Sequence, residues 1–549
     1  MFIARSKWPS KDGKKTYESV WLRESYREGG KVKTRNIANL KHCKPEEIAA
    51  IELALKHKDD LSVLGGIKDL EIKEGPSIGA LWAVFGVASD LGLTKALGSD
   101  FQGKLALWQV LARVLDQGSR LSAARLADRL PVAEVLGFSR GFDENDLYEN
   151  LDWLAARQEA IEDRLFSRRW SEAAPELFLY DVTSSYLEGV HNELADWGYN
   201  RDQKKGKKQI VIGLLCDPEG EPVSTQVFEG HTADLSTFAS QVKKAADRFG
   251  CRRVTFVGDR GMIKSGQMED LSRAGFHYIT AITKAQIRSM LKKGVFQLGL
   301  FDEPLCEVEH GGARYILRRN PFRAEEMAQN RADRLATLRK LAEDRNAYLA
   351  DHPRANPHKA WQKVSEKAGR LQLSAFVTVT AEDRLIGVEV DEDALTGMAE
   401  LDGCYALKTD LPAEAAPART IHDRYKDLAL VEQGFRTMKT MLLEVRPVFV
   451  RRAASTRAHV LVVMLAYLVA RRLGKAGAHL NLTVEEGLDH LKSLGAVEVG
   501  KKGGASALRI PEPAAMSSKL LSALKTKLPA VLPKSSLRVG TRKSIAKAN

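Results

Sequence analysis

The 549-residue sequence lacks several features that would place it in other classes of protein. Its five cysteines form no CxxC pair, which argues against a zinc site or a disulfide framework and favours a reducing cytoplasm. The sequence contains no GxxxxGK[ST] run, which argues against a phosphate-loop ATPase. The most apolar run, Val460 to Ala470, has only eleven residues, whereas a membrane-spanning helix needs about 20. It therefore predicts a buried helix. The first residues also lack the apolar core of a signal peptide.

Positive charge is what the sequence has in excess. Lys and Arg number 84 against 71 Asp and Glu, which gives a net charge of +13. Such an excess favours a polyanionic partner, either nucleic acid or an anionic membrane surface. Since no run is long enough to cross a membrane, we expect a nucleic-acid partner. Residues 514–549 hold eight Lys or Arg and no acid, which predicts a solvated tail that is also suited to phosphates.

The first third of the chain divides into a short β region and a longer helical one. Residues 17–40 predict a β-hairpin whose turn is at Gly29 and Gly30, because glycine supplies the positive φ angles of a tight turn. Residues 76–172 have apolar positions at three- and four-residue spacing, which predicts helices throughout. Within them, Gly118 to Leu126 is compatible with a helix-turn-helix DNA-binding element and equally with a plain helical bundle.

From residue 176 the pattern changes to strands separated by amphipathic helices. Three strands are followed by a helix, a strand, a helix and a fifth strand, the order of a ribonuclease H-like fold. The predicted elements are strands 177–180, 209–216 and 222–228, helix 235–249, strand 254–257, helix 265–274 and strand 277–282.

After residue 284 this pattern is interrupted. We interpret the following block as an inserted α+β subdomain, after which the core resumes with one helix over 422–443 and the C-terminal region is helical. The insertion comprises β structure at 295–301 and 305–317, a charged helix at 323–349, and strands at 375–380 and 405–407. The predicted divisions are an N-terminal hairpin region (1–75), a helical DNA-binding domain (76–172), the first part of the core (173–284), the insertion (285–400), the second part of the core (401–475) and a helical C-terminal region (476–549).

Three acidic residues stand out by their positions. Asp181 ends the first predicted strand and Asp259 ends the fourth, and in a sheet of this order these two strands are neighbours. Two carboxylates so close repel each other unless a cation lies between them, and hard oxygen ligands favour Mg²⁺ or Mn²⁺. The third acid, Glu432, lies on the late helix expected to pack at this edge. Each acid alone is more simply a turn former or a solvated residue, but their joint placement favours a metal site.

The helix that carries Glu432 has two faces. An apolar face is formed by residues that include Leu428 and Val431. A second face at helical spacing holds Tyr425, Glu432, Arg436 and Lys439. We expect Tyr425, Arg436 and Lys439 to contact DNA. An acid that binds metal beside cations that hold phosphates is what phosphoryl transfer requires.

A basic loop joins the first two predicted strands of the core. Because it lies near the acidic edge, a DNA-contacting loop and a solvated loop are equally good interpretations. Trp197 and Trp361 could stack on a base, but packing is the simpler expectation for both. The cations of the loop are Arg201, Lys204, Lys205, Lys207 and Lys208.

With these residues in view, the sequence resembles a bacterial insertion-sequence transposase of the DDE type, from the IS-four superfamily and its IS-sixteen-thirty-four branch. The resemblance covers residues 17–475. It rests on Asp181-Val182-Thr183-Ser184, Phe228-Glu229-Gly230-His231-Thr232, Gly258-Asp259-Arg260-Gly261-Met262 and the Glu432 helix. The family's helix signature is Tyr, two residues, Arg, three residues, Glu, six residues, Lys. This chain matches it at Tyr425, Glu432 and Lys439 but has Leu428 in the Arg position, so Arg424 or Arg436 would have to replace that phosphate contact.

The resemblance implies an enzyme that binds the terminal inverted repeats of a mobile element as a homodimer on paired ends. It also implies two Mg²⁺ or Mn²⁺ ions at Asp181, Asp259 and Glu432, which serve both cleavage and joining to target DNA. Such an enzyme would act on the nucleoid in the bacterial cytoplasm. Two alternatives stay open: a ribonuclease H-like nuclease without strand transfer, and a domesticated, non-catalytic DNA-binding protein.

Overall fold

The structure, a computed structural model, divides into two compact units. We call them the terminal unit (Met1–Arg169, Ser185–Ala195 and Arg436–Asn549) and the central unit (Trp170–Ser184 and Asp196–Phe435). The residues that the structure describes are 1–10, 16–59, 70–199, 201–202, 204–260, 262–440, 443–446, 448–501, 506–537 and 539–541. Gly261 and the last residues of the basic tail, both used in the sequence argument, lie outside them.

The N-terminal hairpin is confirmed, and it is part of a three-stranded antiparallel sheet. The strands are β1 (Phe2–Pro9), β2 (Thr16–Glu28) and β3 (Lys31–Asn39), in the order β1-β2-β3. Gly29 and Gly30 form the predicted turn with φ angles of 58° and 78°. Helix α1 (Pro45–Lys56) contributes Ile48 to a small core with Val20 and Leu40.

The predicted helical stretch is also confirmed. It forms α2 (Gly79–Asp90), α3 (Leu93–Leu97), α4 (Phe101–Leu115), α5 (Arg120–Arg129), α6 (Val132–Leu136) and α7 (Glu144–Arg169). Helix α16 (Ala453–Ala478) contains the apolar run of the sequence. Among the described residues it is the one helix long and apolar enough to cross a membrane, but 83% of that stretch is buried inside the protein. It is therefore a core helix, as predicted from its apolar run of eleven residues, which is too short to cross a membrane.

The C-terminal region is not wholly helical, so that prediction was wrong. Besides α17 (Val484–Lys492) and α18 (Ala515–Ala523), it forms three strands that share a sheet with β4 (Leu70–Ser77). The sheet has the order β17-β16-β15-β4, with β15 (Gly495–Lys501), β16 (Ser506–Arg509) and β17 (Val531–Pro533). Because β4 comes from the opposite end of the sequence, the local pattern carried no sign of this pairing.

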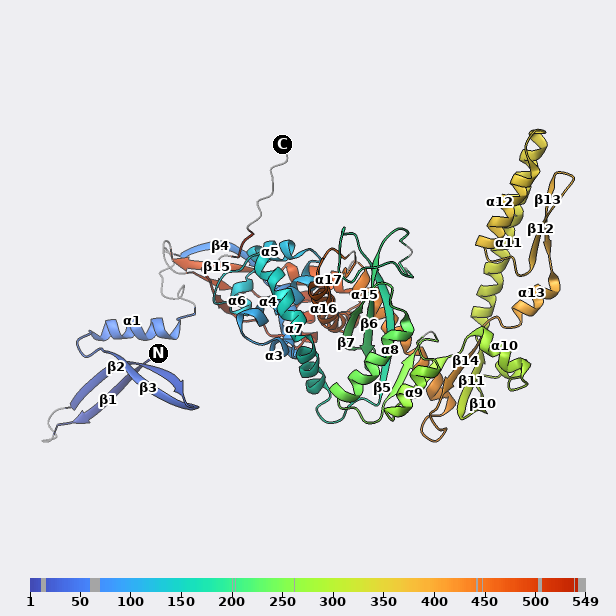
Figure 1. The fold of residues 1–549 in the computed structure, drawn as a ribbon. Coiled ribbons are helices and arrows are strands. Elements are labelled where there is room, and N and C mark those ends of the chain that lie inside the picture. The colour runs from blue at the N-terminus through green and yellow to red at the C-terminus, as the bar shows by residue number, and fades with distance from the viewer. Residues whose placement is uncertain are drawn as a thin grey trace. The chain divides into compact units, whose positions relative to one another are not determined.

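The central unit is built on a mixed eight-stranded sheet of order β10-β11-β14-β9-β8-β5-β6-β7 (Figure 1). The predicted succession of three strands, helix, strand, helix and strand is confirmed. These elements are β5 (Leu177–Tyr186), β6 (Gln209–Cys216), β7 (Pro222–Phe228), α8 (Asp234–Lys243), β8 (Thr255–Gly258), α9 (Ser265–Arg273) and β9 (His277–Ala281), with a π-helical turn (Lys244–Arg248) after α8. Strand β5 continues beyond its predicted end at Asp181, because small and β-branched polar residues there are buried as strand residues.

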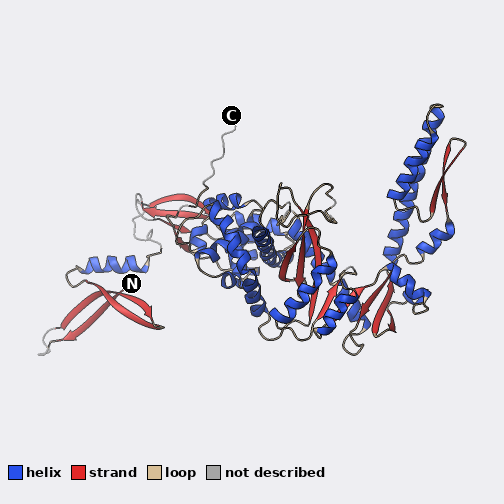
Figure 2. Cartoon of the chain, viewed as in Figure 1, coloured by secondary structure: helices blue, strands red, loops and turns tan. Residues whose placement is uncertain are grey.

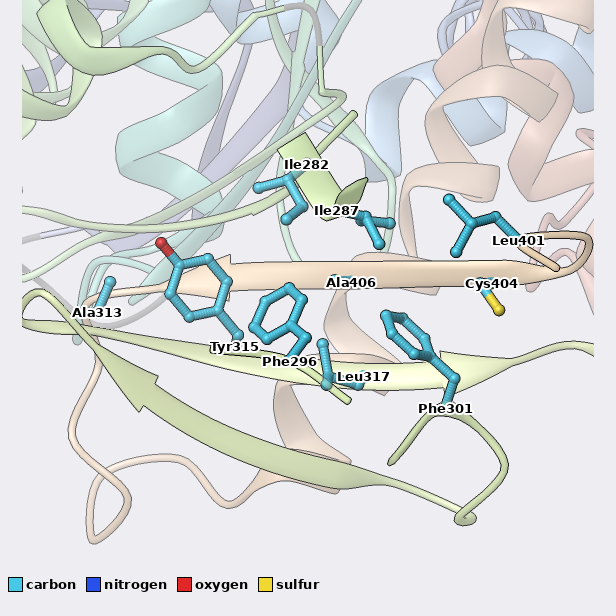
Figure 3. Packing of buried hydrophobic residues seen from close by; sticks show 10 residues of the cluster. All are labelled: Ile282, Ile287, Phe296, Phe301, Ala313, Tyr315, Leu317, Leu401, Cys404 and Ala406. Atoms are coloured by element: carbon cyan, nitrogen blue, oxygen red, sulfur yellow. The ribbon is translucent and has the colours of Figure 1, made fainter. Parts of the chain in front are cut away.

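Part of the block after residue 284 extends this same sheet. Beyond α10 (Lys284–Lys292), strands β10 (Cys306–His310), β11 (Ala313–Arg319) and β14 (Cys404–Thr409) add to its β9 edge. Their apolar core is shown in Figure 3. The predicted β structure at 295–301 was wrong, since residues Leu298–Phe301 form a 3₁₀ helix. Phe296 and Phe301 are both buried in this core. In a strand, side chains separated by an odd number of positions point to opposite faces, so a strand could not bury both rings on one side.

The remainder of the block forms an α+β layer of its own (Figure 2). The predicted charged helix is α11 (Pro321–Asp351), and it packs with α12 (Pro357–Arg370) and the hairpin of β12 (Val377–Glu382) and β13 (Leu385–Val390) around a shared apolar core. A short helix, α13 (Glu392–Ala399), leads back to β14.

The single helix predicted over 422–443 is two helices, α14 (Ala418–Lys426) and α15 (Leu428–Lys439). They meet at Asp427, whose carbonyl accepts a hydrogen bond from the N–H of Leu430 at 2.9 Å. This three-residue spacing tightens the chain locally and interrupts the α-helical ladder. Leu442, part of the predicted apolar face, lies outside the described residues.

Candidate functional site

Asp181 and Asp259 occupy equivalent positions on neighbouring strands. Strands β5 and β8 are parallel, with Tyr180 paired to Gly258, so the two acids follow directly on a paired position. Neighbouring strands lie about 4.8 Å apart. Each carboxylate accepts a hydrogen bond from the next backbone N–H, at 2.8 Å for Asp181 and 2.7 Å for Asp259. The fold therefore places the two acids side by side, as the strand order predicted.

Aromatic packing fixes the strands behind these acids. The ring of Phe238, on α8, lies 5.9 Å from that of Tyr180 and 5.4 Å from that of Phe256, measured between centroids. All three side chains are fully buried. Because buried aromatic side chains contribute much of the packing energy of a core, this cluster holds β5, β8 and α8 together.

The electrostatics of Asp181 connect it to both other acids. Burial is the main cause that raises the pKa of its carboxyl group to about 7, and the negative charges of Asp259 and Glu432 act in the same direction. The hydrogen bond from the backbone N–H of Val182 and the charge of Arg201 oppose this rise. A carboxylate that is desolvated beside two other negative charges is destabilised in its ionised form. A cation placed among them would remove that penalty.

Tyr425 joins the site from α14. Its hydroxyl group donates a hydrogen bond to Oδ1 of Asp259 at 3.2 Å. Burial and the charge of Asp259 raise the pKa of Tyr425, so the phenol remains a donor at neutral pH. The sequence predicted that Tyr425 contacts DNA, and the structure shows this hydrogen bond to an acid.

Glu432 is exposed on α15, and its charge acts on Asp181. Arg436 and Lys439 follow it by one and two helical turns, and Arg436 is exposed. Their contact with DNA stays a prediction. Leu428, in the signature's Arg position, is buried with an exposed fraction of 8% and is not available to a phosphate. Of its suggested replacements, Arg424 forms a 3.3 Å ion pair with Asp427.

The three acids do not form a closed metal site. Among the described residues, no three His, Cys, Asp or Glu side chains lie close enough together to hold an ion between them. The donor chemistry nevertheless fits a hard divalent cation, because carboxylate oxygens are its preferred ligands and Asp181 has unfavourable negative neighbours. The residues present are therefore suited to Mg²⁺ or Mn²⁺.

The basic loop between β5 and β6 reaches this site through Arg201. The Arg201 side chain donates to Oδ1 of Asp234 at 2.6 Å, and its backbone N–H donates to Oγ of Ser184 at 2.9 Å. Lys204, Lys205 and Lys208 are exposed, whereas Lys207 is half-buried. The role of these four lysines in DNA binding stays a prediction.

The two tryptophans differ in their surroundings. Trp361 is packed as expected, and its Nε1 donates to the carbonyl of Val379 at 2.8 Å. Trp197, which was expected to pack, is 58% exposed in the segment that precedes the basic loop.

A cationic hollow next to Asp259 was missed by the sequence argument. This cavity has a volume of about 500 Å³, and the described residues that line it include the four cations Arg260, Lys264, Lys293 and Lys408 and no acid. Burial lowers the pKa of Lys408, which lies on β14. Arg260 and Lys264 follow Asp259 closely and could have been found by that proximity. Lys293 and Lys408 are brought there only by the tertiary fold.

Paired acids beside a cationic hollow define a site suited to chemistry on phosphate esters. A family model described as the transposase DDE domain matches residues 172–469, more than half of the chain. The chain belongs to this family. A second model, the N-terminal domain of IS1634 family transposases, matches residues 6–63. The protein is thus a DNA transposase, an enzyme of a class that binds and cleaves DNA and generally depends on divalent metal.

Other comparisons add little to this assignment. A cryo-EM structure of a piggyBac transposase synaptic complex with hairpin DNA is 9% identical in sequence and covers 82% of each chain, with a TM-score of 0.33. A score this low supports no conclusion about the present chain. No curated protein matches the sequence.

Proposed function

We propose that this transposase binds the terminal inverted repeats of its element and uses Asp181, Asp259 and Glu432 to cleave DNA and join it to a target. The main support is the pairing of Tyr180 with Gly258, which sets Asp181 and Asp259 at equivalent positions of parallel strands. The influence of Glu432 on the pKa of Asp181 supports the third assignment.

The central unit is, in this proposal, a ribonuclease H-like core. Three consecutive strands are followed by strands β8 and β9 that run parallel to β5 and are reached through helices. In such α/β arrangements functional residues gather at the carboxyl ends of parallel strands. Asp259 directly follows the last residue of β8, which is consistent with that rule.

The acids would hold two divalent cations, Mg²⁺ or Mn²⁺. When bound, such ions lower the pKa of an attacking water and stabilise negative charge on the phosphate in the transition state. Tyr425 orients Asp259 by donating to its Oδ1, so one ligand oxygen is held in place. Arg260 and Lys264 line the hollow beside Asp259 and are suited to hold a neighbouring phosphate of the same DNA strand.

Target capture and element-end binding involve further parts of the chain in this proposal. The basic loop with Arg201 and the exposed Arg436 on α15 contact DNA backbone. Two copies of the chain bind the paired ends of the element as a homodimer. Joining of the cut end to a second DNA distinguishes this function from that of a nuclease with the same acids.

The experiment is a Mn²⁺-dependent nicking assay on DNA that carries the element's flanking inverted repeats. We expect Asp181→Ala, Asp259→Ala and Glu432→Ala each to abolish nicking and strand transfer while DNA binding is retained. Glu269→Ala is the matched control, because Glu269 is an exposed acid on α9 that pairs with Arg273. Undiminished cutting by any of the three variants would show that the assignment of that acid is wrong.

A further inference from the structure

The terminal unit contains a second cationic cavity, and its lining residues all belong to that unit. It has a volume of about 650 Å³. Its lining comes from the end of α4, the turn before α5, two residues of α7, residues 444, 446 and 449–452, and the start of α16. Five arginines and one glutamate contribute to its lining: Arg113, Arg120, Arg446, Arg451, Arg452 and Glu444. Positive charge therefore dominates this cavity.

Two of these arginines are buried, which is unusual for a group that stays charged. Arg113 is 6% exposed and Arg120 is 7% exposed. Burial lowers the pKa of Arg113 to about 10, and burial together with the charge of Arg113 lowers the pKa of Arg120 to about 9. Two buried guanidinium groups that repel each other destabilise the fold unless a negative charge compensates them.

Hydrogen-bond partners inside the protein satisfy the two buried guanidinium groups only in part. The Arg113 side chain donates to the carbonyl of Gln117. The Nη2 of Arg120 lies 3.4 Å from Nδ1 of His459, and Nε2 of His459 lies 3.3 Å from the carbonyl of Val445. Nε2 therefore donates to that carbonyl and Nδ1 accepts from Arg120, so His459 is neutral. Among the described residues, none accepts a hydrogen bond from the buried Nε of Arg120.

The acids near the cavity are partly engaged elsewhere. Asp116, whose charge acts on Arg113, accepts a hydrogen bond from the hydroxyl group of Ser122 at 2.8 Å. Arg452 forms a 2.6 Å ion pair with Asp152, which does not line the cavity. Glu444 is exposed and also acts on Arg113. In the part of the chain that the structure describes, none of these carboxylates accepts a hydrogen bond from the Nε–H of Arg120.

The N-terminus of a helix also lines the cavity. The cavity includes Gly118, Ser119 and Arg120, the turn and first residue of the ten-residue helix α5. Helix N-termini favour anions through their free N–H groups and the helix dipole. Two exposed aromatic residues, Tyr148 (42%) and Phe449 (66%), stand in the same lining and offer flat apolar surface beside the charges.

We propose that this cavity binds a phosphate group of a nucleic acid strand, with Arg120 as its central ligand. The phosphate chemistry follows from the buried guanidinium groups and the helix N-terminus, whereas the choice of DNA as its source rests on the proposed function. Arg113 and the exposed arginines add to the attraction, and Tyr148 and Phe449 face the sugar or base attached to that phosphate. The cavity is thus a second anchor for DNA.

The first experiment measures thermal unfolding of the full chain with inorganic phosphate, a deoxynucleoside monophosphate or a DNA duplex added. We expect each to raise Tm of the wild type. Phosphate and the mononucleotide should have little effect on Arg120→Gln, and the duplex should raise the Tm of this variant less than that of the wild type. In the absence of anions, Arg120→Gln should unfold at the same temperature as the wild type or higher, because an uncompensated buried charge has been removed. Arg129→Gln, an exposed arginine at the other end of α5, is the control and should respond to phosphate like the wild type.

The second experiment measures affinity for a DNA duplex across a salt series. Loss of one phosphate contact should reduce the slope of log K against log salt by about one and weaken binding uniformly across sequences. Arg120→Lys, which keeps the charge without the Nε–H, should recover part of the affinity. Arg113→Gln tests the same cavity independently if Arg120→Gln does not fold.

The outcomes separate this proposal from the catalytic one. If Arg120→Gln lowers Tm and still responds to phosphate and DNA like the wild type, Arg120 is a structural residue and the proposal is wrong. Stabilisation by free phosphate without any change in the DNA salt slope would identify a site for small anions and overturn the DNA anchor. Neither result bears on Asp181→Ala, whose loss of nicking tests the catalytic acids alone.

Discussion

At the scale of single residues, the ionised form of Asp181, which a metal ion would bind, is the form that destabilises the folded protein. Its pKa of about 7 in the folded protein lies above the value of about 3.9 for an unfolded chain. The folded state therefore holds the proton more tightly. Ionisation of Asp181 lowers the free energy of unfolding, and this loss begins at about pH 4 and is complete above pH 7. A difference of about three pKa units corresponds to a loss of at most about 4 kcal/mol.

Asp181→Asn should therefore unfold at a higher temperature than the wild type at pH 8 without divalent metal, and the difference should vanish at pH 4. Thermal unfolding followed by circular dichroism measures both. Mg²⁺ or Mn²⁺ should stabilise the wild type but not the variant. The control is Asp196→Asn, because a backbone hydrogen bond from Trp197 and the neighbouring His231 lower the pKa of Asp196. A destabilised Asp181→Asn at pH 8 would contradict the argument.

Tyr425 provides a second test at this scale, since its hydroxyl group contacts Asp259. A hydrogen bond to a charged group contributes about 1.5–3 kcal/mol, so its loss in Tyr425→Phe should slow cleavage by roughly 10-fold or more. DNA affinity should not change. Single-turnover cleavage measures the rate, with Tyr348→Phe as control, because that tyrosine stacks on His352 of the α11 layer. Equal rates for the two variants would exclude an orienting role.

At the scale of secondary-structure elements, the contact between β5 and β6 controls the position of the acids. Gly213 on β6 faces Tyr180, and a Cβ atom at Gly213 would lie 2.4 Å from the Tyr180 hydroxyl oxygen. Because Tyr180 is fully buried and precedes Asp181, the ring cannot move without disturbing the strand. Overpacking of this kind costs about 1–3 kcal/mol.

Gly213→Ala should therefore lower the free energy of unfolding by that amount in urea titrations and reduce cleavage as well. Gly266→Ala is the matched control, since a Cβ atom at Gly266, in the first turn of α9, meets no atom within 4 Å. Alanine there should be neutral or stabilise by about 0.5–1 kcal/mol. Similar stabilities for both variants would mean that Tyr180 has room to adjust.

At the scale of the whole molecule, the net charge of +13 predicts strongly salt-dependent DNA binding. Six to ten phosphate contacts would reduce affinity by roughly 10³–10⁵ between 50 and 200 mM salt. Fluorescence anisotropy with a labelled duplex measures this slope. Single-stranded DNA of equal length should give a shallower slope because its charge density is lower. A slope near zero would show that the excess charge does not act on DNA.

Local patterns in the sequence determined the order of elements in the core, the glycine turn between β2 and β3, and the burial of α16. Each depends on side-chain periodicity or backbone freedom within a few residues, which the sequence displays directly. The same information located Asp259 at the end of β8 and placed Asp181 on the neighbouring strand. The two acids occupy equivalent positions because β5 and β8 pair in parallel, and the order of elements implies that pairing.

Only the tertiary structure decided which distant segments meet. Strand β15 pairs with β4 from the other end of the chain, Lys408 reaches the hollow beside Asp259, and Arg120 approaches His459 of α16. Periodicity reports which face of an element is buried, but not its partner, because that choice depends on shape and charge across the whole fold. The sequence by itself therefore determined the class of enzyme, whereas the pairing of remote segments decided which cations line the hollow beside Asp259 and the cavity at Arg120.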